Sequence, residues 1–109
     1  MIRLGVLGST KGTDLQAILD AISKKELDAE VSLVVSNKEK AYILERAENY
    51  KIPNYYISHN GLSRKKFDSL ITEQLKEHEV DLVLLIGFMR ILSKEFCSEW
   101  SDKILNVHP

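Results

Sequence analysis

Short apolar runs alternate with amphipathic stretches along the whole chain. Residues 2–7 form an apolar run, and residues 30–36 form a run rich in β-branched side chains; both patterns are typical of buried strands. Residues 81–87 are apolar without alternation, as expected for a strand that is covered on both faces of a sheet. Shorter runs at residues 54–58 and 104–108 predict two further strands.

Helical periodicity fills the intervals between these strands. An apolar stripe with spacing i, i+3, i+4, i+7 follows the first strand: Leu15, Ile18, Leu19 and Ile22. Residues 41–50 have helical propensity. Ser63 can cap a third helix, and its apolar face consists of Phe67, Leu70, Ile71 and Leu75. Ser93 opens a short fourth helix that runs through Trp100.

Strictly alternating strands and helices predict an α/β fold: a doubly wound, Rossmann-like, mostly parallel sheet of about five strands. In such sheets ligands bind beyond the carboxyl ends of the strands, near the point where the strand order reverses. Three segments follow predicted strand ends, at residues 8–14, 87–93 and 106–108. These segments are therefore the candidate site.

Composition narrows the class of protein. The chain has 109 residues, of which 44% are hydrophobic and 28% charged, and its formal net charge is -1, which describes one soluble domain. Balanced charge argues against nucleic-acid and membrane partners. No apolar run is long enough for a membrane span or a signal peptide, and the single Cys97 fits a reducing compartment. We therefore expect a cytoplasmic protein, whose oligomeric state the sequence does not indicate.

The segment GSTKGTD connects the first strand to the first helix. It matches neither the dinucleotide fingerprint nor the P-loop. It is a glycine-containing turn before a helix N-terminus, whose free N–H groups and dipole favour an anion. Gly8 and Gly12 permit close backbone approach, and Thr13 can donate its hydroxyl. The alternative is a plain loop in which Thr13 or Asp14 caps the helix.

The segment GFMRILS places large apolar side chains where a surface loop is expected. An apolar loop with a single arginine is typical of a wall for a flat organic ligand. The alternative is that these side chains fold back under the next helix.

Asn106 and His108 lie two residues apart on the last predicted strand, so their side chains share a face. An amide donor beside a protonatable imidazole suits oxyanion stabilisation and proton movement in acyl-type transfer. The alternative is a strand-end histidine that is hydrogen-bonded to the backbone. Neither a metal nor a covalent nucleophile is required for this chemistry, and we expect none.

Taken together, these motifs resemble one enzyme family. GFMRILS followed by LNVHP, with GTDLQAI near the start and SNK after the second strand, is similar to the phosphoribosylglycinamide formyltransferases. These are folate-dependent enzymes of purine biosynthesis, and the similarity runs along the whole chain. The resemblance implies transfer of a formyl group from 10-formyltetrahydrofolate to the amine of glycinamide ribonucleotide, both small-molecule substrates.

The resemblance also implies roles for individual residues. The ribonucleotide substrate would be bound by Gly12, Thr13, Asp14, Met89 and Pro109. The folate would be contacted by Arg64, Arg90, Ile91, Leu92 and Asn106, with Met89 in the same folate-lining segment and Arg64 near the glutamate tail of the folate. Asn106 and His108 would be the catalytic pair, and both would donate to the formyl oxygen.

The chain departs from the family pattern in two respects. The family commonly has asparagine at the position of Asp14, and a carboxylate beside a phosphate is repulsive. The family also continues after the His-Pro motif with a further half, which includes an aspartate that partners the histidine. We therefore expect residues 1–109 to be the N-terminal, nucleotide-binding part of a single formyltransferase domain, weakly active or inactive alone.

Two alternatives remain open at this point. Methionyl-tRNA formyltransferase and formyltetrahydrofolate deformylase share the fold and an Asn-x-His element, although a short, non-basic chain disfavours tRNA. A non-catalytic module that holds a phosphate-bearing ligand is the other alternative.

Overall fold

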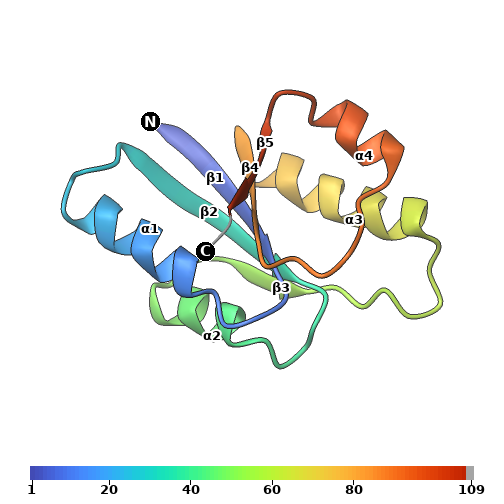
Figure 1. The fold of residues 1–109 in the computed structure, drawn as a ribbon, viewed down its shortest axis with the longest axis horizontal. Coiled ribbons are helices and arrows are strands. Elements are labelled where there is room, and N and C mark those ends of the chain that lie inside the picture. The colour runs from blue at the N-terminus through green and yellow to red at the C-terminus, as the bar shows by residue number, and fades with distance from the viewer. Residues whose placement is uncertain (108–109) are drawn as a thin grey trace.

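The computed structural model describes residues 1–107, which form a five-stranded sheet with flanking helices (Figure 1). The elements are β1 (Ile2–Gly8), α1 (Thr13–Ser23), β2 (Ala29–Ser36), α2 (Tyr42–Asn49), β3 (Asn54–Tyr56), α3 (Arg64–Glu77), β4 (Leu82–Ile86), α4 (Lys94–Glu99) and β5 (Ile104–Val107). All strand pairs are parallel, in the order β3-β2-β1-β4-β5. The predicted doubly wound α/β fold is confirmed.

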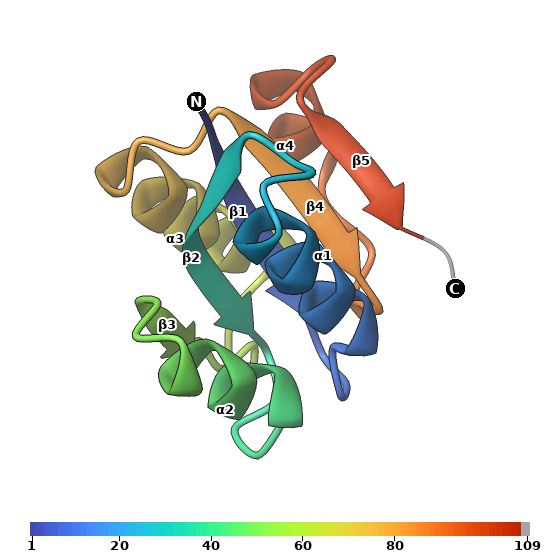
Figure 2. The same ribbon diagram turned by 90° about the vertical axis from the view of Figure 1, so that its left-hand side faces the viewer.

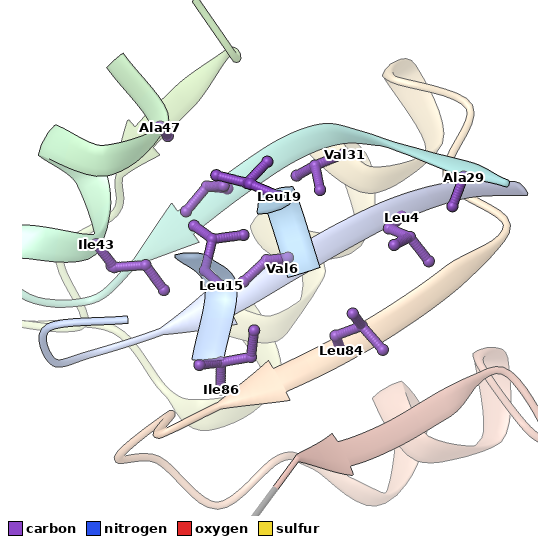
Figure 3. Packing of buried hydrophobic residues seen from close by; sticks show 11 residues of the cluster. Leu4, Val6, Leu15, Leu19, Ala29, Val31, Ile43, Ala47, Leu84 and Ile86 are labelled. Atoms are coloured by element: carbon purple, nitrogen blue, oxygen red, sulfur yellow. The ribbon is translucent and has the colours of Figure 1, made fainter. Parts of the chain in front are cut away.

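Helices cover both faces of the sheet (Figures 1 and 2). On one face, α1 and α2 pack on the strands through a cluster of buried residues (Figure 3): Leu4, Val6, Leu15, Leu19, Ala29, Val31, Val34, Ile43, Ala47, Leu84 and Ile86. On the other face, α3 and α4 bury a second cluster: Leu7, Leu33, Val35, Phe67, Ile71, Leu75, Val80, Val83, Phe96 and Trp100. Fully burying one such side chain contributes roughly 1.5–3 kcal/mol, so both layers stabilise the sheet.

The register of β2 shifts in the middle of the strand. Leu4 of β1 is opposite Val31, whereas the next residue, Gly5, is opposite Leu33. Ser32 is the extra residue, as in a β-bulge. Because of this extra residue, Val31 and Leu33 lie on opposite faces of the sheet, Val31 in the cluster under α1 and α2 and Leu33 in the cluster under α3 and α4.

Two of the predicted helix starts are confirmed by their capping hydrogen bonds. The Ser63 hydroxyl accepts a hydrogen bond from the Lys66 amide at 3.1 Å. The Ser93 hydroxyl accepts one from the Phe96 amide at 3.0 Å. Such caps typically contribute about 1 kcal/mol.

The strand order reverses between β1 and β4, which are adjacent in the sheet but far apart in the sequence. Helices α1 and α2 connect β1 to β2 and β2 to β3, so these strands extend the sheet from one edge of β1. Helices α3 and α4 lead to β4 and β5, which extend the sheet from the other edge of β1. The loops after β1 and β4 therefore diverge at this point, which is where ligands bind in open α/β sheets. No helix within residues 1–107 is both long and apolar enough to cross a membrane.

Candidate active site

A cavity of about 480 Å³ lies beyond the carboxyl ends of β1, β4 and β5. Its walls are formed by Thr10, Lys11, Gly12, Thr13, Asp14, Ile86, Gly87, Phe88, Asn106 and Val107. Described residues from each of the three segments that the sequence singled out therefore border one cavity. They come together because the parallel strands end at the same edge of the sheet.

The loop after β1 enters α1 without a side-chain cap. Gly12 is the N-cap residue, it has a left-handed backbone (φ 69°), and no side chain accepts a capping hydrogen bond there. The alternative in which Thr13 or Asp14 caps the helix is therefore wrong. A left-handed N-cap strongly favours glycine, and a Cβ on Gly12 would also overlap the Ile43 side chain. Both side chains, Thr13 and Asp14, line the cavity instead.

Helix α2 holds this loop through Arg46. The Arg46 Nε donates a hydrogen bond to the Lys11 carbonyl at 2.6 Å, and its Nη1 donates to Gln16 Oε1 at 3.2 Å. The guanidinium also lies over the Tyr42 ring, 4.8 Å from the ring centroid. Because the Lys11 carbonyl is held by Arg46, the backbone of Lys11 and Gly12 is held in place where it borders the cavity.

The loop after β4 is irregular, as predicted. Of the two alternatives for its side chains, a wall for a ligand or packing under the next helix, each holds for some of the residues. Met89 and Ile91 are 68% and 74% exposed, so these two do not fold under a helix. Phe88 and Leu92 do, because they pack against the cluster beneath α3 and α4. Phe88 also borders the cavity.

Several residues with an implied folate role lie away from this cavity. The Arg90 guanidinium lies over the Phe67 ring at 4.7 Å from its centroid, on the α3 side of the loop. Arg64 is exposed in the first turn of α3. Of the residues with an implied folate contact, Asn106 alone borders the cavity.

Two backbone amides of the loop after β4, one near each end, donate hydrogen bonds to buried side chains. The Met89 amide donates to Ser9 Oγ at 2.8 Å, and the Ser9 hydroxyl donates to Asn37 Oδ1 at 2.5 Å. At the other end, the Ser93 amide donates to Asp68 Oδ2 at 2.5 Å. Residues 89 and 93 are thereby tied to β1 and α3.

Sequence reasoning missed three of these supporting residues. Asp68 is 2% exposed, and its spacing from Ile71 and Leu75 puts a carboxylate within the apolar stripe of α3, which was an available signal of a buried polar role. Ser9 and Arg46 gave no such signal. Their partners lie up to 80 residues away in the sequence.

Asn106 lies on β5, opposite Leu85 in the register with β4, and it is exposed at the cavity. His108 and Pro109 lie outside the described residues, so their predicted places beside Asn106 stay predictions. Among residues 1–107, no three His, Cys, Asp or Glu side chains form a group that could hold a metal ion.

The family model for formyl transferases matches residues 2–109. The chain belongs to the formyl transferase family. It is 38% identical over 110 residues to the phosphoribosylglycinamide formyltransferase of Haemophilus influenzae, covering 100% of this chain and 52% of that protein. It is 44% identical over 109 residues to the trifunctional purine biosynthetic protein adenosine-3 of Gallus gallus, covering 99% of this chain and 11% of that protein.

Solved formyl transferase structures agree with the fold. The crystal structure of glycinamide ribonucleotide transformylase 1 from Symbiobacterium toebii superposes with a TM-score of 0.94 at 39% identity, over 100% of this chain and 52% of that one. The chain thus spans about half the length of these single-function relatives, and about a tenth of the trifunctional one.

Proposed function

We propose that this chain takes part in formyl transfer from 10-formyltetrahydrofolate to the amine of glycinamide ribonucleotide, a step of purine biosynthesis. The observation that carries the proposal is the shared cavity, which Asn106 borders together with the glycine-containing loop at the start of α1. Relatives named phosphoribosylglycinamide formyltransferase support the choice of reaction and substrates.

The loop before α1 suits the phosphate of the ribonucleotide. The first N–H groups of a helix lack intrahelical partners and carry partial positive charge, so they bind an anion without any metal. Gly12 brings the backbone to the cavity wall, and Lys11 adds a cation there. Asp14 opposes the phosphate, which makes this site weaker than one with asparagine at the same position.

Asn106 suits the reacting centre. When the substrate amine attacks the formyl carbon, negative charge develops on the formyl oxygen, and the Asn106 amide can donate a hydrogen bond to it. The tetrahedral intermediate then collapses as the bond between the formyl carbon and N10 breaks; the attacking amine loses one proton and N10 gains one, so tetrahydrofolate leaves. His108, in its implied role, would donate to the same oxygen and return a proton to the leaving nitrogen.

The test is formyl transfer by the natural protein that carries this chain. With 10-formyltetrahydrofolate and glycinamide ribonucleotide, mass spectrometry should detect the formylated ribonucleotide, and Asn106→Ala should lower turnover by about 10²–10³-fold. Asn54→Ala, an asparagine on the opposite edge strand, should leave turnover unchanged. Formylation of methionyl-tRNA, or release of formate alone, would favour a related enzyme, and near-wild-type turnover of Asn106→Ala would refute the role of Asn106.

A further inference from the structure

We propose that the buried pair Ser9–Asn37 is a positioning element that fixes the loop after β4 for the formyl donor. The pair touches no proposed substrate atom and acts through the backbone of Met89. The claim about the donor rests on the proposed function, whereas the claim about the loop itself does not.

Ser9 lies where three parts of the sheet edge meet. Its own amide donates to the Gly87 carbonyl at 3.2 Å, and its hydroxyl accepts from the Met89 amide at 2.8 Å. The same hydroxyl donates to Asn37 Oδ1 at 2.5 Å. One side chain thus joins the ends of β1 and β2 to the loop after β4.

Asn37 decides which way the Ser9 hydroxyl points. A serine hydroxyl can donate one hydrogen bond, and Asn37 Oδ1 accepts it. The lone pairs of the hydroxyl oxygen are then free to accept a hydrogen bond from the Met89 N–H. Ser9 is 7% exposed and Asn37 is 4% exposed, so water competes little for these hydrogen bonds.

The Met89 backbone depends on these bonds because its own side chain does not anchor it. Met89 and Ile91 are exposed, so burial anchors neither of them, whereas Phe88 and Leu92 pack beneath α3 and α4 and Arg90 lies over the Phe67 ring. The Met89 backbone is held by its hydrogen bond to the Ser9 hydroxyl, and the Ser93 amide is held by Asp68 at the other end of the loop. Removing the Ser9 hydroxyl therefore releases the Met89 amide, next to Gly87 and Phe88, which border the cavity.

The test compares Ser9→Ala and Asn37→Ala with Ser32→Ala in the natural protein that carries this chain. Ser32 has the same 7% exposure but lies at the bulge within β2, away from the cavity. Ser9→Ala should raise the KM for the formyl donor about tenfold, the expected effect of one buried hydrogen bond, with a smaller change in kcat. Asn37→Ala should act in the same direction, and the double variant should be less than additive. Ser9→Thr, which keeps the hydroxyl, should restore the KM.

A second measurement separates this inference from the proposed function. Amide hydrogen exchange at Met89, measured by NMR without ligand, should become at least about tenfold faster in Ser9→Ala and Asn37→Ala than in Ser32→Ala. If the natural protein transfers no formyl group, the proposed function fails, and this exchange rate alone decides on the loop. Unchanged Met89 exchange in Ser9→Ala, or an equal rise in KM for Ser32→Ala, would overturn the positioning role.

Discussion

Residues 9–14 and residues 87–93 follow neighbouring strands at the same edge of the sheet, but they are held by different means. In the first loop, Gly12 is buried against Ile43, and Arg46 holds the Lys11 carbonyl. In the second loop, Phe88 and Leu92 pack beneath α3 and α4, and Ser9 and Asp68 accept hydrogen bonds from its backbone, but Met89 and Ile91 project into solvent.

This difference matches what each loop is proposed to recognise. A phosphate is small and charged, so it is best met by backbone N–H groups that are already in place before binding. A pterin is a flat heterocycle with polar edges, so its two faces benefit from apolar side chains that become buried when the ligand arrives. In the first loop, Gly12 both packs against Ile43 and presents the backbone to the proposed phosphate, so stability and recognition depend on the same residue. In the second loop, the exposed side chains proposed to meet the ligand are not the groups that hold the loop.

Gly12→Ala should have the largest effect on stability. Alanine costs about 1–2 kcal/mol in the left-handed conformation, and the overlap with Ile43 adds about 1–3 kcal/mol. Urea unfolding should show a loss of this size, and the KM for the ribonucleotide should rise. Gly61→Ala is a matched control, because Gly61 also has positive φ but no neighbour within 4 Å, so only the backbone cost should appear. Equal losses in both variants would mean that packing against Ile43 does not secure the loop.

Arg46→Met should have the next largest effect. It keeps a long side chain but removes the hydrogen bonds to the Lys11 carbonyl and Gln16, so we expect a loss of about 1 kcal/mol in the free energy of unfolding. The KM for the ribonucleotide should rise by up to about tenfold, with the donor KM unchanged. Lys24→Met removes an exposed cation at the far end of α1 and should change neither constant. A ribonucleotide KM for Arg46→Met that matches the control would remove Arg46 from the support of the loop.

The sequence predicted the strands, helices and loops that form the site better than the hydrogen bonds that hold those loops in place. Hydrophobic periodicity was sufficient for five strands, and local capping signals were sufficient for Ser63 and Ser93, because both depend on neighbours in the chain. The convergence of the three segments followed from parallel topology alone.

Long-range hydrogen bonds were not predictable in the same way. The Ser9–Met89 bond spans 80 residues and the Arg46–Lys11 bond spans 35, and no local pattern encodes either pairing. The N-cap of α1 was also misjudged. Thr13 and Asp14 are common cap residues, but the close approach of Ile43 requires glycine at the cap position.

Asp14→Asn should change stability less than Gly12→Ala or Arg46→Met. It should lower the free energy of unfolding slightly and raise the affinity for phosphate. Asp14 lies in the first turn of α1, where a negative charge stabilises the helix by about 0.3–1 kcal/mol, and it makes no capping hydrogen bond that would be lost. Unfolding free energy should therefore fall slightly, while the inhibition constant of inorganic phosphate should fall about threefold as repulsion is removed.

Ionic strength provides the control for Asp14. The gain in phosphate affinity should shrink as salt rises, because a partly exposed charge is screened. Asp28→Asn, on the connection to β2, should leave phosphate inhibition unchanged. Weaker phosphate inhibition in Asp14→Asn would mean that this carboxylate assists the site, for example by positioning Lys11.

Ile91→Ala should have the smallest effect on stability and still impair the donor site. Because Ile91 is 74% exposed, its truncation should change the free energy of unfolding by less than about 0.5 kcal/mol. If bound folate buries one or two of the three carbons that this substitution removes, the donor KM should rise about four- to fifteenfold, since roughly 0.8 kcal/mol is lost for each methylene no longer buried. Ile2→Ala truncates an isoleucine that is 50% exposed at the opposite end of β1, and it should leave the donor KM unchanged. A large loss of stability in Ile91→Ala would show that Ile91 itself helps to hold this loop, and an unchanged donor KM would exclude Ile91 from the folate wall.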